Sequence, residues 1–512
     1  MRLRLAAAGL LAALLYHFAL PRYGLPWLGW VAVLPLCVAV EKWPAPPAQV
    51  ARWLGLAFGL PFGLLSFRWL TGLSPAADMT APWLLWPGLL LWVAYLTLYP
   101  YAFLRVYAAL RARGPRALWL APPLWTALEW LRGSGLLAFS WIHISQTQAA
   151  PGGYLAPAGW VGGLGLGFLM LLAQAGAAAL IAGRERPARR QGALALAAAI
   201  LLLALGAVPS QRARPERVPV AALQGNVALA DKWEPHYRLE NLRIYRELGQ
   251  TAVTEGATLL VWPETAFPVS LFYDRHAERA LRQTALELGA PCITGFQGLS
   301  PLASGGFAYR NAALLVGAGG AFEGAYSKVK LLPFGERIPL IELIMPGVEI
   351  DLGQANFTPG AGPRVLAGGP LRSAVFICYE MGFAGSVRRA AAAGAELLVN
   401  ISNDGWFSDP LAMELHAALS PMRAAENGLP VLRCGNNGVT AIFDARGRCL
   451  GRLPLDTRAA LVAAVQPPAR ASFYARTGGW TAPLAWFAYL VGAALASAGS
   501  RVGVARVLRR ES

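Results

Sequence analysis

Seven long apolar runs follow one another in the first 209 residues of the chain, and an eighth lies near its C-terminus. Most of these runs are long enough to cross a hydrocarbon layer of about 30 Å, which takes roughly 20 helical residues. Because a backbone inside lipid must satisfy its own hydrogen bonds, each run is expected to form a helix. The sequence therefore predicts a multi-pass α-helical membrane bundle of about eight spans. The runs cover about residues 5–21, 25–41, 53–73, 82–104, 116–135, 157–183, 192–209 and 480–500.

The composition supports a membrane protein and excludes several other classes. Only 14% of the residues are charged and 56% are hydrophobic, whereas a soluble domain has about 25% charged residues. A disordered chain and a disulfide-rich secreted domain are excluded, because the chain is long and apolar and holds only five Cys. The net charge of +17 lies mostly between the apolar runs, so it indicates membrane orientation and no nucleic-acid partner.

The positive residues predict how the helices are oriented. The N-terminus and the connections on its side of the membrane carry sixteen Lys and Arg residues, whereas the opposite connections carry only Arg22. Since positive residues are retained in the cytoplasm, both termini are expected there. Seven crossings then place residues 210–479 outside the cytoplasm. The first run also resembles a signal peptide, but it lacks a small-residue cleavage site and is expected to remain as a helix.

A change of composition after residue 209 predicts a second domain. Residues 210–219 form a polar linker with Arg and Pro, and from 220 to 478 short β-rich runs alternate with amphipathic stretches. This alternation is typical of a layered α/β domain. The predicted organisation is a transmembrane bundle at 1–209, a linker at 210–219, an extracytoplasmic catalytic domain at 220–478, and a last helix with a basic tail at 479–512. The expected strands are Val218–Gln224, Thr258–Trp262, Cys292–Phe296, Ala312–Val316, Ser373–Cys378, Leu397–Ile401, Val431–Cys434, Thr440–Phe443 and Ala460–Val465, and the expected helices are about 234–256, 274–289, 383–394 and 410–428.

Arg68, Glu129 and Arg132 are ionisable residues within predicted spans. Charge at membrane depth is costly, so such residues are candidates for function. Glu129 and Arg132 are three positions apart on one helix face. An ion pair between them near the outer interface is therefore favoured over a catalytic role.

Glu264 and Lys328 are the acid–base candidates of the second domain. Glu264 directly follows an apolar strand in the segment Trp262-Pro263-Glu264-Thr265. It is either a general base or a helix-capping or solvated carboxylate. Lys328 is one of only four Lys in a chain with 41 Arg, which suggests that a compact ammonium is needed at this position. The alternative is a surface Lys retained by chance. Glu336 follows closely enough to orient it.

Cys378 is the candidate nucleophile. An apolar strand delivers it to a turn just before a predicted helix near Phe383. A thiol near a helix N-terminus and a cation tends to be a thiolate and hence nucleophilic. The alternatives are a buried structural Cys or a disulfide with Cys292, Cys434 or Cys449, because a compartment outside the cytoplasm is oxidising.

Several short segments together resemble one family, the bacterial apolipoprotein N-acyltransferases. The resemblance covers essentially the whole chain, including Gln224-Gly225-Asn226 with Lys232-Trp233, and Glu129-Trp130-Leu131-Arg132-Gly133. The Glu, Lys and Cys set is shared with all nitrilase-like enzymes, whereas the segments at 333–336 and 403–407 and the helix bundle make the resemblance specific to the acyltransferases. The segments that carry the resemblance in the second domain are Trp262-Pro263-Glu264-Thr265, Tyr326-x-Lys328, Pro333-Phe334-Gly335-Glu336, Cys378-Tyr379-Glu380 and Asn403-Asp404-x-Trp406-Phe407.

The resemblance implies a nitrilase-like α-β-β-α sandwich on a bacterial inner membrane, with its catalytic domain on the periplasmic side. It implies that Cys378 takes the sn-1 acyl chain of a phospholipid, expected to be phosphatidylethanolamine, as a thioester. The acyl chain then passes to the α-amine of the diacylglyceryl-Cys of an apolipoprotein. The enzyme is expected to act as a monomer without metal or cofactor. The implied triad is Glu264, Lys328 and Cys378, and the implied supporting or substrate-binding residues are Glu336, Tyr379, Glu380, Trp233 and Trp406.

Three features leave other interpretations open. Cys434 and Cys449 stand where the family has other residues, so they either pair or remain free thiols. His416 is disfavoured as a base, because nitrilase-like chemistry uses Glu and Lys. The alternative function is a membrane-tethered amidase or nitrilase that hydrolyses a small C–N substrate, and a further one is a transporter or lipid-binding scaffold with an inactive second domain.

Overall fold

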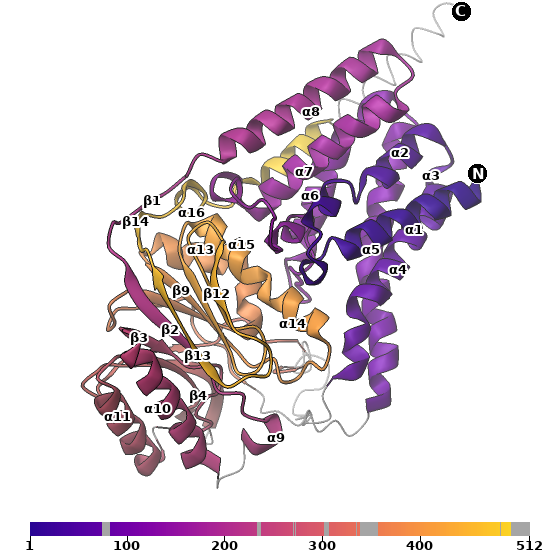
Figure 1. Cartoon of the computed structure of the whole chain (residues 1–512). Helices are drawn as coiled ribbons and strands as arrows, with labels where there is room; N and C mark the ends of the chain where they lie inside the picture. The colour runs from indigo at the N-terminus through magenta and orange to yellow at the C-terminus, as the bar shows by residue number, and fades with distance from the viewer. Residues whose placement is uncertain are drawn as a thin grey trace, which may run out of the picture. The chain divides into compact units, whose positions relative to one another are not determined.

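The structure is a computed structural model of the whole chain (Figure 1), and it describes residues 1–73, 82–232, 237–269, 271, 273–301, 307–333, 335–337, 357–481 and 483–492. The chain divides into two compact units. The first comprises Met1–Thr71, Trp83–Pro209 and Gly479–Ser512, and the second comprises Gly72–Pro82 and Ser210–Gly478.

The first unit is helical. Among its described residues, four helices are long and apolar enough to cross a membrane, namely Pro47–Gly72, Pro82–Arg111, Ala158–Ala182 and Arg186–Gly206. They confirm a multi-pass helical region, while the expected number of eight spans stays a prediction. Its main α-helices are α1 (Arg2–Phe18), α2 (Leu34–Lys42), α4 (Leu56–Phe67), α5 (Leu85–Arg111), α6 (Ala121–Arg132), α7 (Ala158–Ala182) and α8 (Arg186–Gly206).

The remaining apolar runs form shorter helices. The run 25–41 splits into the 3₁₀-helix Pro26–Trp30 and the nine-residue α2, because Pro26, Gly29 and Pro35 interrupt it. The run 116–135 likewise divides into a 3₁₀ turn and the 12-residue α6. The last run appears as a helix at Pro483–Gly492, and the rest of this run lies outside the described residues.

The predicted ion pair between Glu129 and Arg132 is wrong. Within the described residues these two side chains form no ion pair with each other, and both bind the backbone of the loop that follows α6. Glu129 Oε1 accepts a 2.8 Å hydrogen bond from the Ile144 N–H, and Arg132 Nη2 donates to the Trp141 carbonyl at 3.1 Å. Both side chains therefore stabilise the same loop, because they provide hydrogen-bond partners for backbone groups that are buried there.

The second unit is the predicted α-β-β-α sandwich. One six-stranded sheet has the order β13-β2-β3-β4-β5-β6 and the other has the order β12-β11-β10-β9-β8-β7. Helices cover the outer faces of the two sheets (Figure 1). The strands are β2 (Val218–Gln224), β3 (Leu259–Val261), β4 (Cys292–Pro301), β5 (Phe307–Val316), β6 (Phe322–Ser327), β7 (Val365–Leu366), β8 (Ser373–Ile377), β9 (Leu397–Ser402), β10 (Val431–Gly435), β11 (Ala441–Phe443), β12 (Cys449–Arg452) and β13 (Ala459–Val465), and the larger helices are α10 (Arg238–Thr254), α11 (Arg275–Leu288), α13 (Ala384–Ala392), α14 (Pro410–Ala417) and α15 (Leu419–Asn427).

Alternation along the strands builds the two layers of the core. In β2, Val220 and Ala222 join the cluster between the sheets, while Ala221 and Leu223 pack toward α10 and α11. Successive side chains of a strand point to opposite faces, so a strand buried on both faces is apolar throughout. This explains why β2, β3 and β8 were recognisable as continuous apolar runs.

The predicted helix over 410–428 is two helices in the structure. α14 ends at Ala417 and α15 begins at Leu419. Pro421 has no backbone N–H to donate to the carbonyl four residues earlier, and its ring would clash there. The helix consequently breaks at Ala418, and Pro421 lies in the first turn of α15, where its missing N–H is tolerated.

Candidate active site

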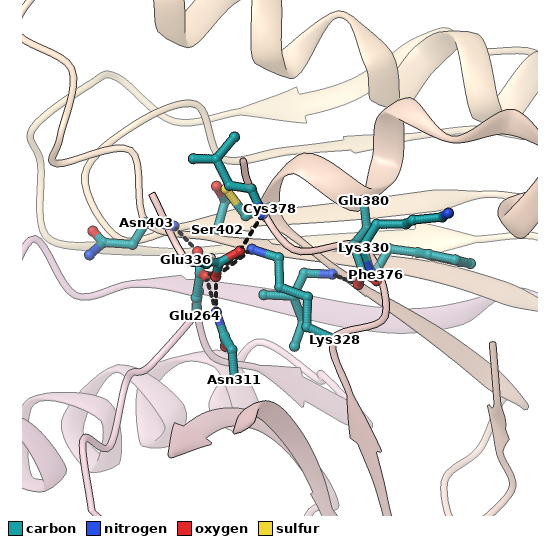
Figure 2. A network of polar contacts seen from close by, with 12 residues as sticks. Glu264, Asn311, Lys328, Lys330, Glu336, Phe376, Cys378, Glu380, Ser402 and Asn403 are labelled. Atoms are coloured by element: carbon teal, nitrogen blue, oxygen red, sulfur yellow. Dashed lines mark hydrogen bonds and ion pairs between the residues drawn. The ribbon is translucent and has the colours of Figure 1, made fainter. Parts of the chain in front are cut away.

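The side chains of Glu264, Lys328 and Cys378 come from three different strand ends of the second unit and converge on one small region (Figure 2). Glu264 lies two residues beyond the Trp262 that ends the apolar run of β3, Lys328 directly follows β6, and Cys378 directly follows β8. Strands of both sheets thus contribute to one site. The three residues that the sequence singled out are near one another in the fold.

Glu264 is held by hydrogen bonds at both carboxylate oxygens. Asn311 Nδ2 donates to Oε1 at 2.7 Å, and the Asn403 N–H donates to Oε2 at 2.9 Å. The residue is only 7% exposed. The ammonium of Lys232 also donates to the backbone carbonyl of Glu264 at 2.7 Å. These contacts fix a buried carboxylate in one orientation, as a general base requires, and they make a solvated surface role untenable.

Lys328 is a buried ammonium between two carboxylates. Its Nζ lies 2.8 Å from Glu336 Oε1 and 3.8 Å from Glu264 Oε1. Burial on its own would lower the pKa of Lys328, but the negative charges of Glu336 and Glu264 raise it above its usual value. The side chain therefore stays protonated at neutral pH and supplies a fixed positive charge to the site.

Glu336 and Asn311 complete this cluster. Asn311 Nδ2 donates to Glu336 Oε1 at 3.0 Å as well as to Glu264, so one amide connects both carboxylates. Glu336 Oε2 accepts from the Leu332 N–H at 2.8 Å. The orienting contact of Glu336 with Lys328 was expected from the sequence, whereas Asn311 was missed. The available signal was an Asn in the middle of β5, directly before the apolar run Ala312–Val316, where a buried amide needs partners.

Cys378 stands on a strained turn. It has φ = 54°, a left-handed value that non-glycine residues rarely adopt. Burial and then Glu264 raise the pKa of its thiol above the usual value, and Lys328 lowers it only in part. These two effects oppose the thiolate that a nearby cation and a helix N-terminus would favour, so a base is needed to take the proton of the thiol. Cys378 is also a free thiol and not part of a disulfide.

Glu380 connects the segment 326–330 around Lys328 with the turn that carries Cys378. Its Oε1 accepts from the backbone N–H groups of Val329 and Lys330 at 2.7 and 2.9 Å, and its Oε2 accepts from the Ile377 N–H at 2.9 Å. The Tyr326 hydroxyl donates to the same carboxylate at 2.8 Å. These contacts join residues on both sides of Lys328 to the residue before Cys378. Glu380 thus sets the relative position of the ammonium and the thiol.

The aromatic candidates are found in different settings. Tyr379 is buried and makes an edge-to-face contact with Phe383 at 5.1 Å between ring centroids. Trp406 is partly exposed on the turn after β9. Trp233 lies outside the described residues, although the neighbouring Lys232 is described and buried.

Cys434, Cys449 and His416 are not part of the polar cluster around Glu264 and Lys328 described above. Cys434 is buried and its thiol donates to the carbonyls of Leu223 and Val261, whereas Cys449 is exposed, and both are free. His416 Nδ1 binds Asp404 at 2.9 Å. In the part of the chain that the structure describes, no three His, Cys, Asp or Glu side chains are grouped to hold a metal ion.

Known protein families match both units of the chain. Residues 12–176 match the apolipoprotein N-acyltransferase N-terminal domain, and residues 219–474 match the carbon-nitrogen hydrolase family. An apolipoprotein N-acyltransferase of Geobacter metallireducens is 32% identical to this chain, with 95% of this chain and 94% of that protein covered. The one of Azotobacter vinelandii is 34% identical, with 94% of each chain covered.

Among solved structures, an amidase from Nesterenkonia is similar to part of the chain. The similarity covers 53% of this chain and 97% of the amidase, with 23% sequence identity and a TM-score of 0.40.

Proposed function

The chain belongs to the apolipoprotein N-acyltransferase family, and from this membership we propose that it moves one acyl chain from a membrane phospholipid to the α-amine of a diacylated apolipoprotein. The family resemblance predicted from the motifs is confirmed. The amidase alternative is less well supported, because relatives along nearly the whole chain are acyltransferases. The donor in this proposal is phosphatidylethanolamine, and the acting species is a monomer.

In the first half-reaction, Cys378 Sγ attacks the carbonyl carbon of the sn-1 ester. Glu264 takes the thiol proton as the C–S bond forms and the carbonyl oxygen becomes an oxyanion; collapse of this tetrahedral intermediate then breaks the ester C–O bond. Glu264 then returns the proton to the leaving glycerol oxygen, so a lysophospholipid departs and an acyl thioester remains on Cys378. The raised pKa of Cys378 supports this order, because a neutral thiol needs a base during attack.

Lys328 is the proposed electrostatic stabiliser of the oxyanion that forms on the attacked carbonyl. A buried ammonium already fixed by Glu336 at 2.8 Å does not have to reorganise when negative charge develops. Its raised pKa keeps it from acting as a proton donor to the oxyanion. We therefore assign Glu264 the movement of protons and Lys328 the fixed charge.

In the second half-reaction, the α-amine of the lipoprotein attacks the thioester. An N-acyl bond forms, the C–S bond breaks, and a proton passes from the amine through Glu264 to the sulfur of Cys378. The free thiol is restored and the site is ready for another phospholipid. Trp406 and Trp233 are the proposed aromatic contacts for the two lipid substrates.

The proposed location is the bacterial inner membrane. Both termini are assigned to the cytoplasm and the catalytic unit to the periplasmic side. The support is the bias of sixteen positive residues against one between the two sets of connections. Both lipid substrates would then be available at the outer face of the same bilayer.

The observation that carries the proposal is the buried hydrogen-bonded cluster of Glu264, Asn311, Glu336 and Lys328 beside Cys378. The test is an assay of purified full-length protein with a fluorescent phospholipid and a diacylated lipopeptide. The proposal expects the fluorescent acyl chain on the lipopeptide and expects none with Cys378→Ala. Hydrolysis of small amides without acyl transfer would instead support the amidase.

A further inference from the structure

Arg433 is a completely buried guanidinium on β10, and the proposed chemistry does not use it. Its side chain is 0% exposed. Nε donates to the Val439 carbonyl at 3.0 Å, Nη2 donates to Asp404 Oδ2 at 2.7 Å, and Nη1 donates to Asn400 Oδ1. A planar fork of this kind can hold several acceptors at fixed angles, which a lysine cannot do.

One arm of this network reaches the nucleophile. Asn400 lies on β9, and its oxygen is held by Arg433. Its Nδ2 therefore points the other way, where it donates to the Phe376 carbonyl at 3.0 Å and to the Cys378 carbonyl at 3.4 Å. Cys378 has the left-handed φ of 54°, a conformation that persists only where neighbouring groups enforce it. The hydrogen bond from Asn400 to the Cys378 carbonyl helps to hold this strained backbone conformation.

The other arm reaches the general base. Asp404 is fully buried, and besides Arg433 it accepts from Ser402 Oγ at 2.8 Å and contacts His416 Nδ1 at 2.9 Å. These partners fix the loop after β9. The residue just before Asp404 in that loop is Asn403, whose N–H donates to Glu264 Oε2 at 2.9 Å.

From these contacts we infer that Arg433 is a positioning residue: it fixes the position of the nucleophile Cys378 relative to the general base Glu264. It acts on Cys378 through Asn400 and on Glu264 through Asp404 and the Asn403 N–H. A shift of about 1 Å between reacting groups can cost roughly 100-fold in rate. The inference rests on the proposed roles of Cys378 and Glu264, and it adds a buried cation that touches neither substrate nor reacting atoms.

The first test is Arg433→Lys in the full-length enzyme. This variant keeps the charge that Asp404 needs, since an unpaired buried carboxylate would endanger folding, but it cannot bridge Asn400 and Asp404 together. We expect kcat for acyl transfer to fall roughly 100-fold, with the KM for phospholipid changed less than about twofold. An unchanged kcat would overturn the inference, and so would a change confined to KM.

The second test, Asn400→Asp, removes the contact of Asn400 with the Cys378 carbonyl and leaves the contact of Arg433 with Asp404 in place. It keeps an oxygen toward Arg433 but replaces the donor that faces the Cys378 carbonyl with a second acceptor. We expect kcat to fall by a similar factor while the contact of Arg433 with Asp404 survives. A second readout is the alkylation rate of Cys378, followed by peptide mass spectrometry across a pH series. We expect the pH profile of this rate to change in Asn400→Asp, and an unchanged profile together with an unchanged kcat would contradict the inference.

Arg423→Lys is the matched control. Arg423 is 4% exposed and pairs with the equally buried Glu426 at 2.8 Å, so it is a second buried arginine in the same unit with no contact to Asn400 or Asp404. We expect this control to lower the melting temperature without changing kcat. Equal losses of kcat in Arg433→Lys and Arg423→Lys would show that replacing any buried arginine of this unit lowers activity through stability, and would contradict a positioning role specific to Arg433. If Cys378→Ala retained acyl transfer, the proposed function itself would fail, whatever the arginine variants do.

Discussion

The amide nitrogen of Asn311 lies 2.7 Å from Oε1 of Glu264 and donates a hydrogen bond to it. That residue is buried in the middle of β5, and its amide nitrogen also donates to Glu336 at 3.0 Å. Two carboxylates close to one ammonium repel each other, and a neutral donor between them reduces that repulsion without adding charge. Asn311 is consequently part of the geometry in which Glu264 can accept a proton from Cys378.

Asn311→Leu should therefore damage catalysis more than folding. The substitution keeps the size of the side chain and removes the donor, so both carboxylates lose a hydrogen bond worth roughly 1–3 kcal/mol to a charged partner. We expect kcat for acyl transfer to fall between about 10- and 100-fold. Asn427→Leu is the control, because Asn427 is also buried but its side chain binds the Arg423 carbonyl. Equal activity of the two variants would contradict the role given to Asn311.

Glu380→Gln tests the clamp between the lysine segment and the nucleophile turn. Glutamine cannot accept at both ends, so either the Ile377 N–H or the pair of N–H groups at 329–330 loses its partner. We expect a loss of about 1–3 kcal/mol in stability together with a lower kcat. Glu396→Gln is the comparison, since Glu396 accepts from the Arg372 N–H at 2.9 Å outside the cluster. That variant should lose stability in a thermal melt and keep its kcat.

The pH dependence of Cys378 alkylation tests the protonated resting thiol. Because burial and Glu264 raise the pKa of Cys378, the alkylation rate should still be rising at about pH 9, with no plateau near neutral pH. Glu264→Gln removes a negative charge that opposes the thiolate. Its alkylation should therefore become faster at a given pH, even though acyl transfer is lost. Lys328→Met should shift the profile to higher pH, and a neutral-pH plateau in the unmodified enzyme would refute a protonated thiol.

The redox state of the cysteines gives a further prediction. All five Cys are free, including the exposed Cys449 and the buried Cys434. Alkylation of the unfolded, unreduced protein should therefore add five labels by intact mass. Three labels would reveal a disulfide. Cys449→Ala should leave acyl transfer unchanged, because this thiol is exposed and donates to the Gly451 carbonyl of its own strand at 3.3 Å.

Much of the second unit could be predicted from sequence, because strands buried on both faces are uniformly apolar. β2 was predicted with its observed bounds, Val218–Gln224. β6 (Phe322–Ser327) was missed, since its residues are mostly half-buried and include Glu323 and Gly324. The break between α14 and α15 was also missed, although Pro421 supplied a local signal for it.

The sequence allowed the candidate site residues to be identified, but it did not allow the hydrogen bonds among them to be predicted. Glu264, Lys328 and Cys378 stand at strand ends in recognisable segments, so the sequence indicated their positions. The function of Glu380 as a clamp depends on the N–H groups of residues about 50 positions away in sequence. The protonation of Cys378 depends on burial and on the charge of Glu264 after folding. Neither property is visible in a local motif.

The most direct measurement is mass spectrometry of the full-length enzyme after incubation with phosphatidylethanolamine and no acceptor. We expect one added acyl group, located on the peptide that contains Cys378, and its disappearance when a diacylated lipopeptide is added. Glu264→Gln should form little or no adduct. An acyl group on another residue, or acyl transfer to the lipopeptide by Cys378→Ala, would contradict the thioester account.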